Sequence, residues 1–516
     1  MANKLRLDPV TLEILWTRLV SMVDEAAASM VRTSFSTIVR DSNDYAVVLL
    51  DTKGRSLAQS SLSIPSFIGT LPLTVRHLLK KFPLETLKPG DVLATNDPWL
   101  GTGHLYDINI ARPIFRKGKP VAISATVAHA PDIGGRLRSP EIREIYEEGL
   151  RIPPVKLLSQ GEPDRAVFDI LEGNVRIPEQ VMGDLWAQIT TNRFLEQRLL
   201  DLLEETNVDI DALGTEIQSR SEQAMRKAIR EMPDGSHSFS MDSDGFEGMP
   251  ITIACKVTVK GDCIDIDYSG SSQQVPRSVN VVPNYTFSYT AYAVKCVLCP
   301  DVPNNEGSFL PITTSAPLGS ILNPRYPAAV GARAMTGHIL PPVVMGALSK
   351  AAPDKVQAAS GSPQWCVHLA GEHRQKGFAT VFFLNGGQGA ARGHQGLPAI
   401  SYPSNLSNTP IEVMESQVPL LVHRRAVRGN TGGKGKSRGG DGQCFEFEMR
   451  TEKDVPITMS FMANRLEQGA PGLHGGGTGA KGRVLLNGRP LDPRAISLIK
   501  GGDRVTVETP GGGGFG

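Results

Sequence analysis

The first long apolar pattern in the chain has helical spacing. Its apolar positions are Leu12, Leu15, Leu19, Met22, Val23 and Ala26. Asp8 and Pro9 precede this pattern, and an N-cap residue followed by proline is a common start of a helix. The pattern therefore predicts a helix that begins at Pro9.

Residues 178–231 have the same spacing and predict two long helices. The apolar rows of the first contain Val181, Leu185, Ile189 and Leu195. The pattern breaks near 207–211, so we expect the chain to turn there.

Residues 45–51 (YAVVLLD) predict a strand in the first part of the chain. After residue 232 the composition changes, and short alternating segments that predict further strands appear. The clearest lie at 251–259 (ITIACKVTV), 263–270 (CIDIDYSG) and 445–450 (FEFEMR). Asn487 and Gly488 add a hairpin turn signal. An apolar segment at 284–299, compatible with a helix, interrupts these strands.

These patterns predict a mixed α+β fold with more than one domain. We place a boundary near residue 232. Residues 1–232 would form an α/β part with long helices, and residues 233–516 a β-rich, glycine-rich part.

A β-hairpin is predicted within residues 101–135. Residues 108–115 (INIARPIF) and 120–128 (PVAISATVA) are apolar and rich in β-branched side chains, and Arg-Lys-Gly-Lys lies between them. If the turn is centred near Lys117, residue i faces roughly residue 235 minus i. Asp107 would then lie opposite Ala128.

Two His-x-x-Asp pairs lie at the open end of this hairpin. They are His104 with Asp107, and His129 with Asp132. Neighbouring strands are about 5 Å apart, so all four side chains would gather in one place. Imidazole and carboxylate ligands suit a divalent ion such as Zn, Mn or Fe. The spacing alone leaves a second interpretation open, in which these residues only cap turns.

Composition excludes several classes of partner. Lys and Arg number 54 and Asp and Glu 53, and the resulting net charge of +1 gives no reason to expect nucleic acid or an acidic membrane surface. No apolar run approaches the roughly 18 residues of a membrane span. The start MANKLRLDPV lacks the apolar core of a signal peptide, so we expect a cytoplasmic protein. Among six cysteines, only Cys296 and Cys299 are close, and we expect reduced, buried thiols.

The glycine-rich segment 428–443 (RGNTGGKGKSRGGDGQ) is not a phosphate-binding loop of the P-loop type. That motif needs a glycine five residues before Gly435, where this chain has Asn430. A helix should also follow, and the run RGGDG disfavours one. An anion-binding loop and a flexible structural loop both remain open.

No nucleophilic catalytic motif is apparent in the sequence. There is no Gly-x-Ser-x-Gly turn, and the cysteines lie in no Cys/His motif. The histidines outside the hairpin are expected to be mostly ordinary surface or loop residues. They include His338, His368, His373, His394, His423 and His474.

Longer motifs resemble the hydantoinase B/oxoprolinase family. TNDPWLGTGHLYDI (95–108) and AHAPDIGG (128–135) resemble its signature. Further matches are EEGLRIPPVKL (147–157), NVRIPEQVMGDLWAQI (174–189), IDYSGSS (266–272), VPNNEG (302–307), GGKGKSRGGDG (432–442) and TPGGGGFG (509–516). The resemblance covers essentially the whole chain.

This resemblance implies a subunit of an ATP-dependent cyclic-amide hydrolase that acts on hydantoins, 5-oxoproline or lactams. Related subunits occur in ATP-dependent ketone carboxylases, such as acetone and acetophenone carboxylases. The resemblance also implies that ATP is bound by a separate hydantoinase A-type subunit, or by a fused half in oxoprolinases. We therefore expect a hetero-oligomer in which this chain has no nucleotide site.

The resemblance also implies a metal-ligand set. His104, Asp107 and His129 match the family's metal motifs, and a further carboxylate is expected before the first strand. Asp44 is our choice for that ligand, with Asp41 in reserve. Many relatives carry a second histidine at the position of Ala130, and a serine at the position of Ala46.

Our hypothesis is that the partner phosphorylates the amide oxygen and this chain hydrolyses the product. The metal would act as a Lewis acid. Asp132 would orient His129 or accept a proton. In a carboxylase, a phosphorylated enol and carboxy phosphate would instead meet at the metal. In a third interpretation the chain is only a scaffold for the ATPase subunit. The motifs look more like the hydrolase branch, which we favour.

Overall fold

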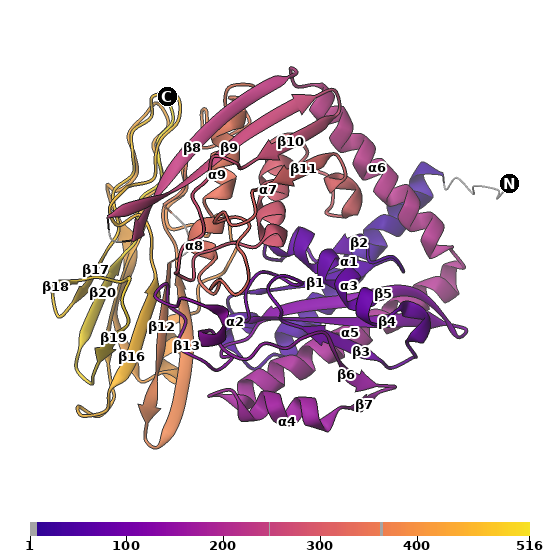
Figure 1. Cartoon of the computed structure of the whole chain (residues 1–516), viewed down its shortest axis with the longest axis horizontal. Coiled ribbons are helices and arrows are strands. Elements are labelled where there is room, and N and C mark those ends of the chain that lie inside the picture. Colours follow the sequence, from indigo (N-terminus) through magenta and orange to yellow (C-terminus); the bar gives the residue numbers. More distant parts are fainter. Residues whose placement is uncertain (1–7, 247, 362–364) are drawn as a thin grey trace.

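The computed structural model describes residues 8–246, 248–361 and 365–516 (Figure 1). The α-helices are α1 Pro9–Thr33, α2 Thr37–Arg40, α3 Phe67–Lys81, α4 Arg165–Gly173, α5 Pro178–Thr206, α6 Ile210–Arg230, α7 Pro283–Leu298, α8 Ala334–Gly337, α9 Leu340–Leu348 and α10 Ile411–Gln417. Short 3₁₀ helices are η1 Leu84–Thr86, η2 Ile145–Glu147 and η3 Glu306–Phe309. The longest helices belong to the first 230 residues.

The helices predicted from apolar spacing are confirmed. Asp8 caps α1, because its carboxylate accepts hydrogen bonds from the backbone N–H groups of Val10 and Thr11. Asn207 ends α5 in the left-handed conformation (φ 49°), and Asp209 caps α6. The apolar segment at 284–299 forms α7.

A seven-stranded antiparallel sheet forms the centre of the first half, in the order β2-β1-β5-β4-β3-β6-β7. Its strands are β1 Tyr45–Leu50, β2 Ser56–Gln59, β3 Val92–Thr95, β4 Asp107–Arg116, β5 Lys119–His129, β6 Val155–Ser159 and β7 Glu162–Pro163. On β1, Val47 and Leu49 pack with α1 and α5, while Ala46, Val48 and Leu50 pack on the side of α3. Helices therefore cover both faces, and the strand is apolar throughout.

Within the described residues, the second half contains three further sheets in addition to helices α7–α10. One has the order β11-β10-β9-β8, with β8 Gly235–Phe246, β9 Met249–Lys260, β10 Cys263–Asp267 and β11 Ile312–Ser315. The next has the order β13-β12-β16-β19, with β12 Trp365–His373, β13 Lys376–Leu384, β16 Ile457–Met462 and β19 Ser497–Ile499. The last has the order β14-β15-β20-β17-β18, with β14 Leu420–Arg428, β15 Gly442–Met449, β17 Arg483–Leu486, β18 Arg489–Leu491 and β20 Arg504–Glu508. The last two sheets share a core and form the sandwich at one side of Figure 1.

The mixed α+β fold class is confirmed. The change of composition after residue 232 coincides with the start of β8. The largest hydrophobic core, however, contains residues from both sides of this point, such as Leu71 and Ala125 with Tyr268 and Val344. The boundary near 232 therefore stays a prediction about the organisation of the chain.

Glycine-rich segments near the C-terminus pack backbone against backbone. The N–H of Gly433 donates to the carbonyl of Gly512, and the N–H of Gly440 to that of Gln388, at 2.8 Å each. A Cβ atom on Gly512 would lie 2.0 Å from the carbonyl oxygen of Gln388. Because these amides are already bonded, the structural interpretation of segment 428–443 is favoured over an anion-binding loop.

The structure also bears on membrane spans and on the cysteines. No helix within the described residues is long and apolar enough to cross a membrane. Within the described residues the cysteines form no disulfide bond, as expected, but not all are buried, because Cys263 is exposed and Cys296 and Cys299 are only partly buried.

Candidate metal centre

The candidate ligands lie at the open end of the hairpin formed by β4 and β5. The two strands are joined at Lys117 and Gly118, which have φ values of 50° and 77°. Positive φ at both central residues is the type I′ turn preferred in two-residue hairpins. The predicted hairpin and its turn are therefore confirmed.

The predicted register of this hairpin was wrong by one residue at the site. A β-bulge between Ile114 and Phe115 leaves one extra residue in β5, so Asp107 pairs with His129 and not with Ala128. Side chains alternate between the two faces of a strand, so directly paired residues point to the same face. The bulge thus places Asp107 and His129 together.

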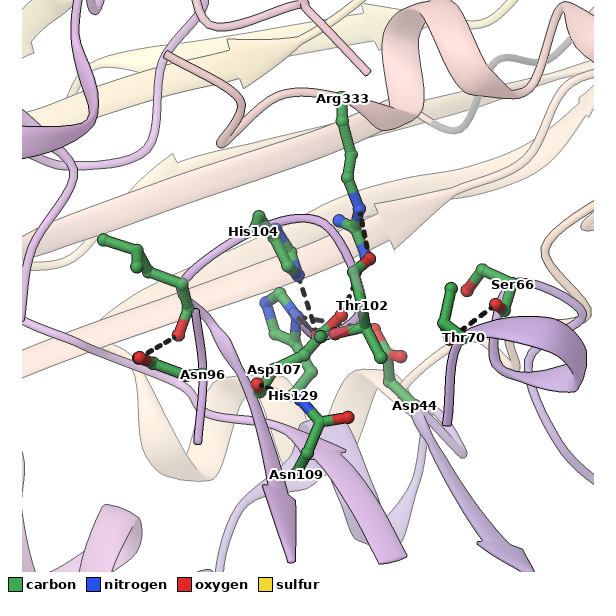
Figure 2. A network of polar contacts seen from close by, with 12 residues as sticks. Asp44, Ser66, Thr70, Asn96, Thr102, His104, Asp107, Asn109, His129 and Arg333 are labelled. Carbon is green, nitrogen blue, oxygen red and sulfur yellow. Dashed lines mark hydrogen bonds and ion pairs between the residues drawn. The ribbon is translucent and has the colours of Figure 1, made fainter. Parts of the chain in front are cut away.

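Three buried side chains converge there (Figure 2). Asp107 Oδ1 lies 2.7 Å from His104 Nε2 and 3.0 Å from His129 Nδ1. The three residues are at most 3% exposed: 2% for His104, 1% for Asp107 and 3% for His129. Such a group of one carboxylate and two imidazoles could hold a metal ion.

The contact between His104 and Asp107 fits a cation better than a hydrogen bond. His104 Nδ1 lies 3.3 Å from the carbonyl oxygen of Gly331, an acceptor, so we assign the ring proton to Nδ1. His104 Nε2 then directs a lone pair at Asp107 Oδ1, and this contact lacks hydrogen-bond alignment. Burial, and next the charge of Arg333, hold the pKa of His104 well below its usual value. Two lone pairs this close repel each other unless a positive ion lies between them, so the donor set fits a divalent metal.

Asp44 faces this group, while Asp41 does not. Asp44 immediately precedes β1, and its Oδ2 lies 3.9 Å from His129 Nδ1 within the same cavity. Burial, opposed by the charge of His129, raises the pKa of Asp44 to about 6. The carboxylate of Asp41 instead pairs with Arg40 at 3.1 Å. Geometry thus favours Asp44, whose role as a ligand stays a prediction.

The side chain of Asp132 contacts Arg176 and Gly134, not the candidate ligands. Its Oδ2 accepts hydrogen bonds from the backbone N–H of Arg176 at 2.5 Å and of Gly134 at 3.3 Å, and its Oδ1 lies 2.6 Å from Arg176 Nη1. Among the described residues, Asp132 has no hydrogen bond or ion pair with His129. The carboxylate ties its loop to the segment before α5, so the geometry does not support the predicted contact with His129.

Residues from the second half of the chain complete the cavity around the candidate ligands. Its walls include Arg333, Tyr285, Tyr289 and His338, together with Arg138 from the first half. The guanidinium of Arg333 binds Asp107 Oδ2 at 2.7 Å. The carboxylate therefore offers Oδ1 to the histidines and Oδ2 to arginine.

His338 is the clearest functional candidate that the sequence did not reveal. We expected an ordinary histidine, but it is only 3% exposed and its Nε2 lies 3.0 Å from Tyr289 Oη. Burial lowers the pKa of His338 to about 3, so the ring is uncharged. No local motif surrounds it, and only the fold brings it to the cavity. His368 is buried as well, whereas the remaining four agree with the expectation: His373, His394, His423 and His474.

Glu148 stabilises the backbone next to His104. Its Oε1 accepts hydrogen bonds from the backbone N–H groups of Val330 and Gly331 at 2.7 and 2.6 Å. Burial raises the pKa of Glu148 to about 8. The carbonyl of Gly331 faces His104, so Glu148 holds the backbone of the residue whose carbonyl orients this ring. The signal for Glu148 was the stretch EEGLRIPPVKL, which carried the resemblance but no assigned role.

The chain is similar to several known proteins over most of its length. The B-type subunit of a putative D-/L-hydantoinase from Pseudomonas sp. (strain NS671) is 31% identical over 473 residues, which cover 88% of this chain and 80% of that protein. The crystal structure of the ATP-dependent caprolactamase from Pseudomonas jessenii superposes with a TM-score of 0.90 and 28% identity, over 99% of this chain and 91% of that one.

A more distant likeness shows the fold alone. The nucleotide-free structure of an acetone carboxylase has a TM-score of 0.85 at 18% identity, over 99% of this chain and 76% of that one. The family model of hydantoinase B/oxoprolinase matches residues 8–516. The expected resemblance is therefore confirmed, and the chain belongs to the hydantoinase B/oxoprolinase family.

Proposed function

We propose that this chain is the subunit of an ATP-dependent cyclic-amide hydrolase that opens a phosphorylated hydantoin, 5-oxoproline or lactam ring at a metal centre. The observation that carries the proposal is the convergence of His104, Asp107 and His129 on one buried point. The similarity to a chain of an ATP-dependent caprolactamase supports the substrate class.

Three atoms would hold the ion: His104 Nε2, Asp107 Oδ1 and His129 Nδ1. Asp44 is the candidate for a fourth position. Nitrogen and carboxylate donors suit Zn, Mn or Fe. When bound, the ion supplies Lewis acidity, which polarises a carbonyl oxygen and makes a water molecule more acidic.

The partner, a hydantoinase A-type subunit, would transfer the γ-phosphoryl group of ATP to the amide oxygen. In this chain, water adds to the ring carbon, the nitrogen takes a proton, and the C–N bond breaks to leave an acyl phosphate. A second water then releases the carboxylate and inorganic phosphate. Phosphorylation provides the activation that an unstrained amide lacks.

Two groups in the cavity can move the protons of this reaction. Asp44 lines the cavity and, when it does not occupy the fourth position on the ion, its carboxylate can accept a proton from the attacking water. Tyr289 presents a hydroxyl beside His338 and can donate a proton to the leaving nitrogen. Asp132 is the weaker candidate for acid–base work, because its carboxylate is bonded to Arg176.

A ketone carboxylase is the second candidate, because the fold also resembles that of an acetone carboxylase. The same cavity would then bring a phosphorylated enol and carboxy phosphate together. The similarity to caprolactamase is higher in both identity and TM-score, so we favour the hydrolase.

The deciding experiment combines the purified chain with its ATPase partner and measures ATP-dependent turnover of hydantoins, 5-oxoproline, lactams and ketones. We expect ring opening of at least one cyclic amide, with about one tightly bound divalent metal per chain. Carboxylation of a ketone alone would favour the second candidate. Absence of both metal and turnover would favour a scaffold.

Site variants link this activity to the metal. His104→Ala and His129→Ala should each lose the metal and the coupled turnover together, because each removes a proposed ligand. His423→Ala is the control, since this exposed side chain pairs with Glu448 on the surface. Asp132→Asn should keep the metal. A fall in turnover of about 10- to 100-fold in Asp132→Asn, at unchanged thermal stability, would support the role predicted from sequence.

A further inference from the structure

Two buried arginines line the metal cavity. Arg138 is 3% exposed and Arg333 is 4% exposed. A buried guanidinium is costly unless its charge and its five N–H donors are satisfied. The contacts of the two side chains therefore show which donors remain available for a ligand.

Arg333 is only partly satisfied by the protein. Its Nε donates to the carbonyl of Thr102 at 3.0 Å, and its Nη2 binds Asp107 Oδ2 at 2.7 Å. The guanidinium lies 4.2 Å from the ring centre of Tyr285, which fixes its plane. Over the described part of the chain, Nη1 has no hydrogen-bond partner.

Arg138 has still more donors available. Its Nε donates to the carbonyl of Gly331 at 2.7 Å, and its guanidinium lies 5.4 Å from the ring centre of Tyr106. Neither Nη1 nor Nη2 has a partner in residues 8–246, 248–361 and 365–516. Neither is sealed inside protein, unlike Nη2 of Arg425. Two donors of a guanidinium that lines the cavity thus remain available for a ligand.

The charges of the cavity point to a dianion. Without a metal, the two arginines balance the carboxylates of Asp44 and Asp107. A divalent ion on the three ligands would leave an excess of two positive charges in a buried space. Such an excess is costly unless an anion of matching charge enters.

We propose that Arg138 and Arg333, together with the bound metal, form the binding site for the phosphoryl group of the reacting amide and of the phosphate product. This inference rests on the proposed function. Planar guanidinium groups bind phosphate oxygens through paired hydrogen bonds. The phosphoryl group stays attached during ring opening, so the same contacts hold the intermediate through both hydrolytic steps and retain the acyl phosphate until the second water attacks.

Phosphate binding to the full chain tests the site without substrate, ATP or partner. The protein is loaded with Mn²⁺, and titration with inorganic phosphate is followed by calorimetry and by the relaxation of the ³¹P signal. We expect binding with strong paramagnetic relaxation, which places phosphate beside the metal. Chelation of the metal should weaken binding, and acetate should bind more weakly than phosphate.

Variants identify the residues. Arg138→Gln should weaken phosphate binding at least about tenfold at unchanged metal content. Arg112→Gln is the matched control, because Arg112 lies on β4 and pairs with Glu196 outside the cavity. If Arg138→Gln does not fold, Arg138→Lys and Arg333→Lys carry the test, since both keep the charge and lose the fork.

The outcomes separate this inference from the proposed function. Unchanged phosphate affinity in variants that retain the metal would overturn it, as would acetate binding as tightly as phosphate. A chain that binds metal and opens amides with its partner, yet leaves ³¹P relaxation unchanged, would be a hydrolase without this site. Phosphate binding without amide turnover would instead contradict the proposed hydrolase.

Discussion

At the scale of single residues, the surroundings of Glu148 change the protonation state of its side chain. It is 1% exposed, its Oε1 accepts two backbone hydrogen bonds, and its Oε2 has no hydrogen-bond partner within the described residues. Burial outweighs those bonds and the nearby arginines, so the pKa of Glu148 rises to about 8. The side chain is therefore mostly protonated at neutral pH.

This raised pKa predicts a pH-dependent stability. A folded-state pKa above the usual 4.5 means that the stability contributed by Glu148 is complete below about pH 4.5 and is lost as pH rises through about 8. Glu148→Gln, which mimics the neutral acid, should therefore gain stability relative to the wild type over this range, by up to roughly 1.4 kcal/mol per pH unit. Urea unfolding at about pH 5 and about pH 8 measures the difference.

Glu147→Gln is the matched control for this prediction. A hydrogen bond from Arg136 lowers the pKa of Glu147, so its contribution to stability is present above its usual pKa and is lost on acidification. Glu147→Gln should therefore lose stability toward neutral pH, the opposite sign. Parallel pH profiles for wild type and Glu148→Gln would show that Glu148 is charged in the fold.

Among the elements, the β4–β5 hairpin decides the site. Its turn alone would place Asp107 opposite Ala128, and the bulge at Ile114 and Phe115 shifts that pairing to His129. A shift of one residue in a strand exchanges its two faces. The site therefore depends on an irregularity that lies seven to eight residues from Asp107 in the same hairpin.

The glycine-rich segments make a second prediction at the scale of elements. Gly512→Ala would place a Cβ atom 2.0 Å from the carbonyl oxygen of Gln388, which cannot rotate away. We expect a loss of at least about 2 kcal/mol in the free energy of unfolding, measured by denaturant titration. Gly429→Ala, with no atom within 4 Å of the added Cβ, should change stability by no more than about 0.5 kcal/mol. Similar values for both variants would show that these segments are loosely packed.

At the scale of the whole molecule, both halves of the chain contribute residues to the cavity. Asp107 lies in the seven-stranded sheet and Asp44 directly precedes its strand β1, while Arg333 and His338 flank α8 in the second half. One hydrophobic core spans both halves, and Figure 1 shows α7, α8 and α9 lying between the first sheet and the sandwich. The ligands and the surrounding donors are therefore held by one packed structure.

The glycine-rich segment 428–443 also bears on whether the whole chain binds ATP. Segment 428–443 leads into strand β15, whereas a phosphate loop leads into a helix. We expect the isolated chain neither to bind nor to hydrolyse ATP, and turnover to appear only when the partner subunit is added. Equilibrium dialysis with ATP and a phosphate-release assay measure this. ATP hydrolysis that purifies with this chain alone would reverse the assignment of roles.

The sequence by itself determined what is local. The helices α1, α5 and α6 follow from apolar spacing and caps, because their contacts repeat every three or four residues. The hairpin that carries His104, Asp107 and His129 was predictable for the same reason, since a tight turn brings its two ends together.

Only the tertiary structure decided what surrounds these ligands. The bulge that sets the register, the turn of Asp132 toward Arg176, and the arrival of Arg333 and His338 at the cavity have no local signal. Contacts between residues far apart in the chain depend on how the sheets and helices pack into a common core. The spacing of residues along the chain does not record that packing, so the sequence could indicate the candidate ligands but not the walls of the cavity around them.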